Sequence, residues 1–422
     1  MPDRARIVRR ALLLLVVVIA AALVVVIATA DARRTAVVSS PSAAATSSPP
    51  ASPAQPLTTL QSASPSPTPQ PRPGSWVELR WSPPSLVPQG AVLLDAVAWR
   101  DGFVAAADVA GADAYAGATF ISSDGLSWER TATFAATPAI FATSSGLVVV
   151  VNLVGAPRSL ETWTSVDGRS WQRQDRLALT GVAITSVAAR AGAMVAAGLD
   201  TSGRTMVWSS TDGAPWSPRQ LPARAIVGSV AAVGDGFVAL GRDGEPDAGS
   251  GGIAAPGVGR PAAWTSVDGR TWTEARVEGS AAPGAQLSSL FRVTDGLFAI
   301  GSDAAPGQNT RSPLIWTSAD ARDWRIVSPP DHWGLASANG QQAVLFYYAD
   351  FGTTALGAWS TLDGRVWALL QFSGDLADIP GFTPGVGQAS GVDRIVVAPR
   401  GVLVLGQQNG QLKVWFAEAV TR

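Results

Sequence analysis

Few residues in this chain could perform acid–base, nucleophilic or metal chemistry. It has no Cys and one His, His332, which excludes disulfides, Cys nucleophiles and zinc sites built from Cys or several His residues. A Ser-His-Asp triad could use only His332, which we expect to cap a loop beside Trp333. That leaves carboxylates, of which a suitably spaced pair could hydrolyse a glycoside, and three tyrosines, Tyr115, Tyr347 and Tyr348.

Six of the Asp residues belong to one repeated pattern. It reads aromatic residue, Ser/Thr/Ile, Ser/Thr, any residue, Asp, Gly, two residues, Trp, with Ala321 replacing Gly once. Asp-Gly between strand-prone runs is a strong hairpin signal, since Asp caps the turn and Gly supplies a positive φ. We therefore interpret these six Asp residues as turn caps: Asp124, Asp167, Asp212, Asp268, Asp320 and Asp363.

A second type of hairpin precedes each of these turns and occurs once more after the last. A turn Gly is followed by a short apolar run at seven places: Gly102, Gly146, Gly192, Gly236, Gly296, Gly340 and Gly401. The seventh is followed by a third strand, 412–416, without a fourth. The segment Trp76–Trp81 would supply that strand from the other end of the chain.

These counts predict an all-β fold, a seven-bladed β-propeller of four-stranded antiparallel blades over residues 75–422. The N-terminal strand would close the ring and remove an exposed sheet edge. Each hairpin between a third and a fourth strand has an aromatic residue near its start and a Trp at its end. There are seven residues of each kind when Trp415 and Trp81 are counted as the seventh pair. We expect these rings to pack between neighbouring blades.

The Asp turns resemble the Asp-box, or bacterial neuraminidase repeat, of sialidase-like propellers. The boxes here are one residue short, because Asp and Gly are adjacent. The resemblance implies a propeller whose Asp boxes are structural turns. A sialidase would also need a Tyr nucleophile with a Glu partner, an Asp acid/base, an Arg cluster and a Phe-Arg-Ile-Pro-like motif in the first blade. That catalytic motif is absent; Phe291-Arg292-Val293-Thr294 is a partial match in another blade.

In a propeller both repeated turn types lie on one face, so the variable connections must lie on the other. Binding residues are usually found on variable loops, and we expect any site at that end of the channel. A polar residue recurs just after each second strand, and Asp or Asn there would suit either a hard cation such as Ca²⁺ or simple loop initiation. These residues are Asp108, Asn152, Asp200, Asp243, Asp303, Asp350 and Asn409. Tyr115, Tyr347, Tyr348 and Trp333 are candidates for stacking on a sugar.

The N-terminus has the pattern of a membrane anchor. Residues 1–10 contain four Arg and precede an apolar run, 11–30, whose 20 residues span about 30 Å as a helix. The basic flank favours a cytoplasmic N-terminus with the remainder exported. Ala28-Thr29-Ala30 also fits a signal-peptidase site, so secretion after cleavage remains the alternative. Residues 31–74, rich in Pro, Ser, Thr and Ala, are expected to be a disordered linker.

Charge and composition narrow the functional classes. Residues 75–422 carry 24 basic and 30 acidic side chains, a balance that argues against nucleic-acid binding. The interpretation we favour is a membrane-tethered, extracytoplasmic, non-catalytic propeller that needs no cofactor and binds a glycan or a protein. The alternative is a sialidase-like glycoside hydrolase.

Overall fold

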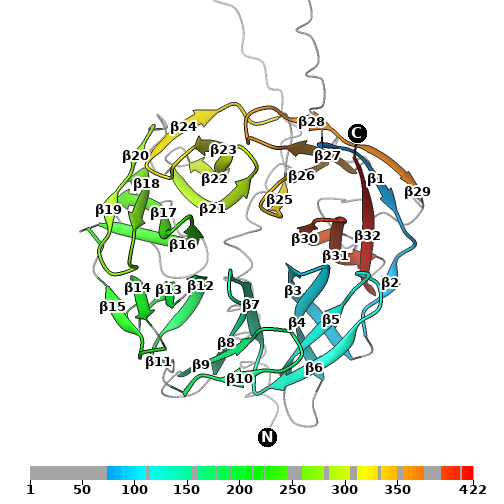
Figure 1. Ribbon diagram of the computed structural model, residues 1–422, viewed down its shortest axis with the longest axis horizontal. Helices are drawn as coiled ribbons and strands as arrows, with labels where there is room; N and C mark the ends of the chain where they lie inside the picture. Colours follow the sequence, from blue (N-terminus) through cyan, green and yellow to red (C-terminus); the bar gives the residue numbers. More distant parts are fainter. Residues whose placement is uncertain are drawn as a thin grey trace, which may run out of the picture.

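The chain forms a ring of seven β-sheets around a central axis (Figure 1). The computed structural model describes residues 74–88, 90–110, 115–153, 159–175, 179–190, 192–200, 202, 204–211, 213–219, 221–222, 224–244, 259–279, 285–304, 311–330, 334–348, 356–374, 391–408 and 411–421. The predicted seven-bladed propeller is confirmed. Each blade has four antiparallel strands, A to D from the axis outward.

The first four blades follow one another along the chain. Blade 1 contains β3 (Ala91–Trp99), β4 (Gly102–Ala110), β5 (Tyr115–Ser122) and β6 (Glu129–Phe134). Blade 2 contains β7 (Pro138–Ala142), β8 (Leu147–Leu153), β9 (Ser159–Ser165) and β10 (Gln172–Arg173). Blade 3 contains β12 (Ala183–Arg190), β13 (Ala193–Leu199), β14 (Thr205–Thr211) and β15 (Ser217–Arg219). Blade 4 contains β16 (Ala225–Val233), β17 (Gly236–Gly244), β18 (Gly259–Ser266) and β19 (Thr273–Glu274).

The last three blades bring the chain back to its beginning. Blade 5 contains β21 (Gln286–Val293), β22 (Gly296–Ala304), β23 (Arg311–Ser318) and β24 (Asp323–Val327). Blade 6 contains β25 (Leu335–Ala338), β26 (Ala343–Tyr348), β27 (Leu356–Thr361) and β28 (Ala368–Leu369). Blade 7 contains β30 (Gly391–Ala398), β31 (Gly401–Gln408), β32 (Gln411–Thr421) and, as its outer strand, β1 (Trp76–Trp81).

The two ends of the propeller close the ring in blade 7, as predicted. β1 pairs antiparallel with β32, placing Trp76 opposite Thr421 and Trp81 opposite Ala417 (Figure 1). The short strand β2 (Ser85–Leu86) continues along β32. Trp81 is buried and its ring makes edge contacts with Phe346 of blade 6 and with Phe372. The closing strand is therefore fixed by side-chain packing as well as by its backbone ladder.

Three blades carry additional short strands at their edges, which the repeat pattern did not predict. β11 (Leu179–Thr180) pairs with β9. β20 (Arg276–Val277) and β29 (Gln371–Gly374) lie parallel to the outer strands β24 and β1. The chain crosses from one blade to the next along these edges, and the pairings cover backbone groups of β9, β24 and β1 that would otherwise be unpaired.

The hydrophobic core lies between the blades. Among the described residues, seven buried clusters each join two consecutive blades, including the pair formed by blades 7 and 1. Trp264 and Trp272 of blade 4 pack against Val195 and Val207 of blade 3, and Trp316 and Trp324 of blade 5 pack against Leu240 of blade 4. The expected packing of Trp side chains between sheets is thus present.

The N-terminal segments expected from the sequence, 1–10, 11–30 and almost all of 31–74, lie outside the described residues. In the part of the chain that the structure describes, no apolar helix reaches the length needed to cross a membrane.

Candidate functional site

The two repeated hairpins lie on one face of the ring, because A–B and C–D turns of an antiparallel blade share an end. We call this the Asp-turn face and the opposite one the loop face. In six of the seven blades the second strand begins at or next to the predicted Gly, as at Gly102 and Gly236. In blade 6 it begins at Ala343, three residues after Gly340. The C–D connections contain the predicted Asp residues, except that Asp212 lies outside the described residues.

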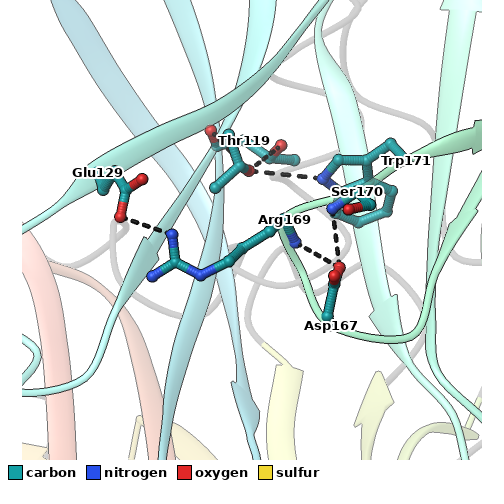
Figure 2. Close-up of polar contacts among 7 residues, drawn as sticks. Thr119, Glu129, Asp167, Arg169, Ser170 and Trp171 are labelled. Carbon is teal, nitrogen blue, oxygen red and sulfur yellow. Dashed lines mark hydrogen bonds and ion pairs between the residues drawn. The ribbon is translucent and has the colours of Figure 1, made fainter.

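Five Asp residues build nearly identical turns. In blade 2 the Asp167 Oδ1 accepts hydrogen bonds from the backbone N–H groups of Arg169 and Ser170, both at 2.8 Å (Figure 2). It also accepts one from the Ser165 hydroxyl at 3.0 Å. The same arrangement occurs in four other turns: around Asp124, Asp268, Asp320 and Asp363. Each of these carboxylates is therefore occupied by its own turn.

The turn geometry accounts for the electrostatics of these Asp residues. The backbone N–H of Thr271, supported by that of Arg270, lowers the pKa of Asp268 below its ordinary value, and the N–H of Arg322 does the same for the pKa of Asp320. A carboxylate held ionised by backbone donors is a poor general acid at neutral pH. The interpretation of these residues as turn caps agrees with this geometry.

The Asp turns also join each blade to the one before it. The Arg169 guanidinium forms an ion pair with Glu129 of blade 1 at 2.7 Å, and the indole N–H of Trp171 donates to Thr131 (Figure 2). Arg270 and Arg365, at the same position of later turns, donate to Thr211 and Thr317 of the preceding blades.

A reciprocal contact comes from the A–B turns. Arg100 donates to the Val166 carbonyl, Arg190 to that of Val267 and Arg400 to that of Ser123, each on the Asp turn of the next blade around the ring. The Arg190 guanidinium also lies over the Phe237 ring. These contacts give the Asp-turn face a network between blades that supports rigidity.

The seam between blades 2 and 3 departs from this pattern. Ala214 replaces the Arg that follows the Asp-Gly pair in blades 2, 4 and 6, and the A–B turn of blade 2 reads Thr143-Ser144-Ser145-Gly146, with no Arg. A groove of about 360 Å³ opens here, lined by both turns. We expected a site on the loop face, so this groove on the Asp-turn face was missed. The replacement of Arg by Ala214 was the sequence feature that could have indicated it.

On the loop face, several predicted polar residues lie within strand ends and not after them. Asp108, Asn152, Asp243 and Asp303 occupy paired positions in β4, β8, β17 and β22, while Asp200 follows β13. The reason for the difference is that the B–C hairpins extend their ladders further than the apolar runs indicate. Asp350 and Asn409 lie outside the described residues.

Each acid of this group whose side chain is described has a local partner. Asp108 accepts a hydrogen bond from Thr137, and burial, opposed by this bond, raises the pKa of Asp108. Asp200 binds Arg204 at 2.8 Å, and Asp243 binds Arg260 at 3.1 Å. The Asn152 Oδ1 is buried and has no hydrogen-bond partner among the described residues. No group of three His, Asp or Glu side chains that could hold a metal occurs in the described part of the chain.

The four candidate stacking residues are not brought together by the described structure. The Tyr347 ring is partly buried, covers the backbone at Gly357 and lies 5.8 Å from the Trp359 ring. Tyr115 and Tyr348 stand at the B–C ends of β5 and β26. Trp333 and His332 lie outside the described residues.

An ion pair between the innermost strands of two blades was also missed by the sequence analysis. Asp95 of β3 and Arg394 of β30 approach to 2.9 Å and join the innermost strands of blades 1 and 7. Burial, opposed by Arg394, raises the pKa of Asp95. Its place beside the closing blade indicates a role in fixing the ring.

Comparison with known proteins adds no family assignment. No known protein-family profile matches the sequence, and no curated protein matches it. Among solved structures, the chain is similar to the β-propeller domain of the trilobed protease from Pyrococcus furiosus, at 12% identity and a TM-score of 0.47, covering 79% of this chain and 95% of that one. It is also similar to an acylaminoacyl peptidase from Pyrococcus horikoshii, at 10% identity and a TM-score of 0.49, covering 78% of this chain and 52% of the peptidase.

Proposed function

We propose that the chain is a membrane-tethered, extracytoplasmic binding module that presents the loop face of its propeller to a glycan or protein ligand. The observation that carries this proposal is the direction of β1. Trp76 pairs with Thr421 at the end of β32, and strand C of every blade ends on the Asp-turn face. Residues before Gly74 therefore join the propeller on that face.

This attachment gives the two faces different surroundings. If residues 11–30 anchor the chain in the cytoplasmic membrane, the Asp-turn face is tethered toward the bilayer and the loop face is directed away from it. The connections of variable length lie on the loop face, where a ligand outside the membrane could reach them. Variable connections on a rigid scaffold are a common location for binding residues.

Described Asp residues on both faces are already paired with neighbouring groups, which makes them poor catalytic acids or bases and favours a binding function. Asp200 and Asp243 are held by Arg side chains of their own blades, and five Asp turns are occupied by backbone donors on the other face. The resemblance to Asp-box propellers supports a structural role for the same turns. A sialidase-like hydrolase is the competing function that the test below includes.

The test uses the absence of Cys to block one face at a time. Ser202, in the B–C connection of blade 3, and Ser123, in the Asp turn of blade 1, are both exposed. In the full chain, Ser202→Cys and Ser123→Cys would each be coupled to a bulky polyethylene glycol maleimide and applied to a glycan array and to surface extracts for partner capture. We expect the Ser202 conjugate to lose binding and the Ser123 conjugate to keep it.

The opposite pattern would place the ligand on the Asp-turn face and refute the proposal. Incubating the unmodified chain with a fluorogenic sialoside and a set of β-glycosides completes the test. Turnover that is abolished by Tyr→Phe at Tyr115, Tyr347 or Tyr348 would replace the binding function by hydrolysis.

A further inference from the structure

The groove between blades 2 and 3 lies where Gly213 of the blade 3 turn leaves space beside blade 2. At Gly168, Gly269 and Gly364, an added Cβ would lie within 3.0 Å of a side chain of the preceding blade. At Gly213 of blade 3, with a similar φ of 70°, nothing lies within 4 Å. Gly213 therefore stands away from blade 2.

The lining of the groove has the chemistry of a site for an uncharged ligand. Val166 and Met194 supply apolar surface above the buried side chains of Leu147 and Val148. Thr143, Ser145 and Gln172 supply hydroxyl and amide groups. Arg190 is the one charged residue among the described residues of the lining, and its guanidinium is bonded to the Val267 carbonyl of blade 4. The described residues of the lining include no aromatic ring, which disfavours sugar stacking.

The chain itself contains a segment that matches this lining. Between residues 39 and 73 the only large aliphatic side chains are Leu57 and Leu60, and Thr58 and Thr59 separate them. Pro56 precedes them, and in a polyproline II conformation with three residues per turn Leu57 and Leu60 would share one face. Arg72 is the only charged residue from 35 to 74.

The point of attachment allows this segment to reach the groove. Gly74 joins the propeller on the Asp-turn face, where the groove opens. The 14 residues from Leu60 to Gly74 can span about 45–50 Å when extended. A compact domain of the propeller's size is about 50 Å across. Because the groove lies within that ring, two to three blades from blade 7, the segment is long enough.

We propose that Leu57–Leu60 binds in the groove between blades 2 and 3 of its own chain, with both Leu side chains on the apolar floor and the Thr hydroxyls at the polar rim. Tethering raises the local concentration of such a segment to about the millimolar range. A Kd of about 1 mM is therefore enough for half occupancy. This inference does not rest on the proposed function, since it concerns the opposite face.

Single-cysteine chemistry tests the proposal in the full chain. Ser145→Cys places an exposed thiol on the groove rim, and Ser123→Cys places a matched thiol on the same face outside the groove. The rate of maleimide labelling is measured for each thiol with the native segment and with Leu57→Ser and Leu60→Ser combined. We expect the double substitution to accelerate labelling at position 145 several-fold and to leave position 123 unchanged.

A second measurement detects the contact directly. Thr59→Cys combined with Ser145→Cys should form a disulfide under mild oxidation several-fold faster than Thr59→Cys combined with Ser123→Cys. Equal labelling rates at position 145 in the two backgrounds, or equal crosslinking rates, would overturn the proposal. Labelling at position 145 that stays slower than at position 123 after the double Leu substitution would also overturn it, because a second copy or another protein would then be the occupant.

Discussion

Two glycines at equivalent positions should respond differently to the same substitution. Gly364 and Gly213 both follow the Asp of a turn and both have a φ of 70°. A Cβ added at Gly364 would lie 2.7 Å from the Cβ of Phe298, a fully buried residue of blade 5, whereas a Cβ added at Gly213 would meet nothing within 4 Å. The pair therefore separates backbone strain from packing between blades.

The magnitudes follow from these two contributions. Both Gly→Ala substitutions impose a left-handed conformation on Ala, at a cost of about 1–2 kcal/mol. Gly364→Ala adds a collision that the buried Phe298 ring can relieve only by moving its strand, and overpacking of this kind costs about 1–3 kcal/mol more. We expect Gly364→Ala to lower the free energy of unfolding by that additional amount relative to Gly213→Ala.

Urea unfolding followed by tryptophan fluorescence measures the difference, since the chain contains 16 Trp residues. The midpoint should fall further for Gly364→Ala at an unchanged slope, which reports a change in stability and not in the surface exposed on unfolding. If the two variants lose the same stability, Gly213 packs against blade 2 as Gly364 packs against blade 5, and the reasoning about the groove is wrong.

Three further predictions concern the closure and the contacts between blades. Trp81→Ala should cost about 3–5 kcal/mol, because it empties a buried site in the closing strand, and calorimetry should show a lower Tm; an unchanged Tm would contradict closure by β1. Arg190→Met should cost about 1–2 kcal/mol through its contacts with Phe237 and Val267, and Arg204→Met, a control at an exposed ion pair, should cost less than about 1 kcal/mol in the same urea titration. Because the pKa of Asp268 is lowered in the folded state, its contribution to the free energy of unfolding is complete above the unfolded pKa of about 3.9 and is lost as the pH falls further. Asp268→Asn should therefore flatten the decline of stability between about pH 5 and pH 2. An equally steep decline would show that this turn does not contribute.

The blade count and the closure could be predicted from the sequence because both depend on local signals that repeat. Asp-Gly turns and turn glycines mark hairpins within a few residues, and the surplus hairpin at Gly401 required a strand from elsewhere in the chain. Trp76–Trp81 supplied it with the same bounds. Even the one irregular turn follows local rules, since Ala321 adopts the left-handed φ of 66° that the missing Gly predicts.

The site could not be predicted at the same level, because it depends on contacts between blades. The hairpin pattern predicts the face on which Asp243 lies. It does not predict the ion pair of Asp243 with Arg260, because this depends on a strand register that extends past the apolar run. The groove arises where Gly213 leaves space beside blade 2 and Ala214 replaces an Arg. A search for repeated patterns finds turns that are alike. The groove is found only by asking which turn lacks an interaction that the other turns make.

The pairing of β1 with β32 also determines how the propeller would respond to mechanical load. A force applied through the residues before Gly74 would enter at Trp76 and run along β1, in the direction of the strand. The hydrogen bonds between β1 and β32 would then be sheared together and not opened one after another. The strand that closes the ring is thus oriented to resist pulling from its own N-terminal end.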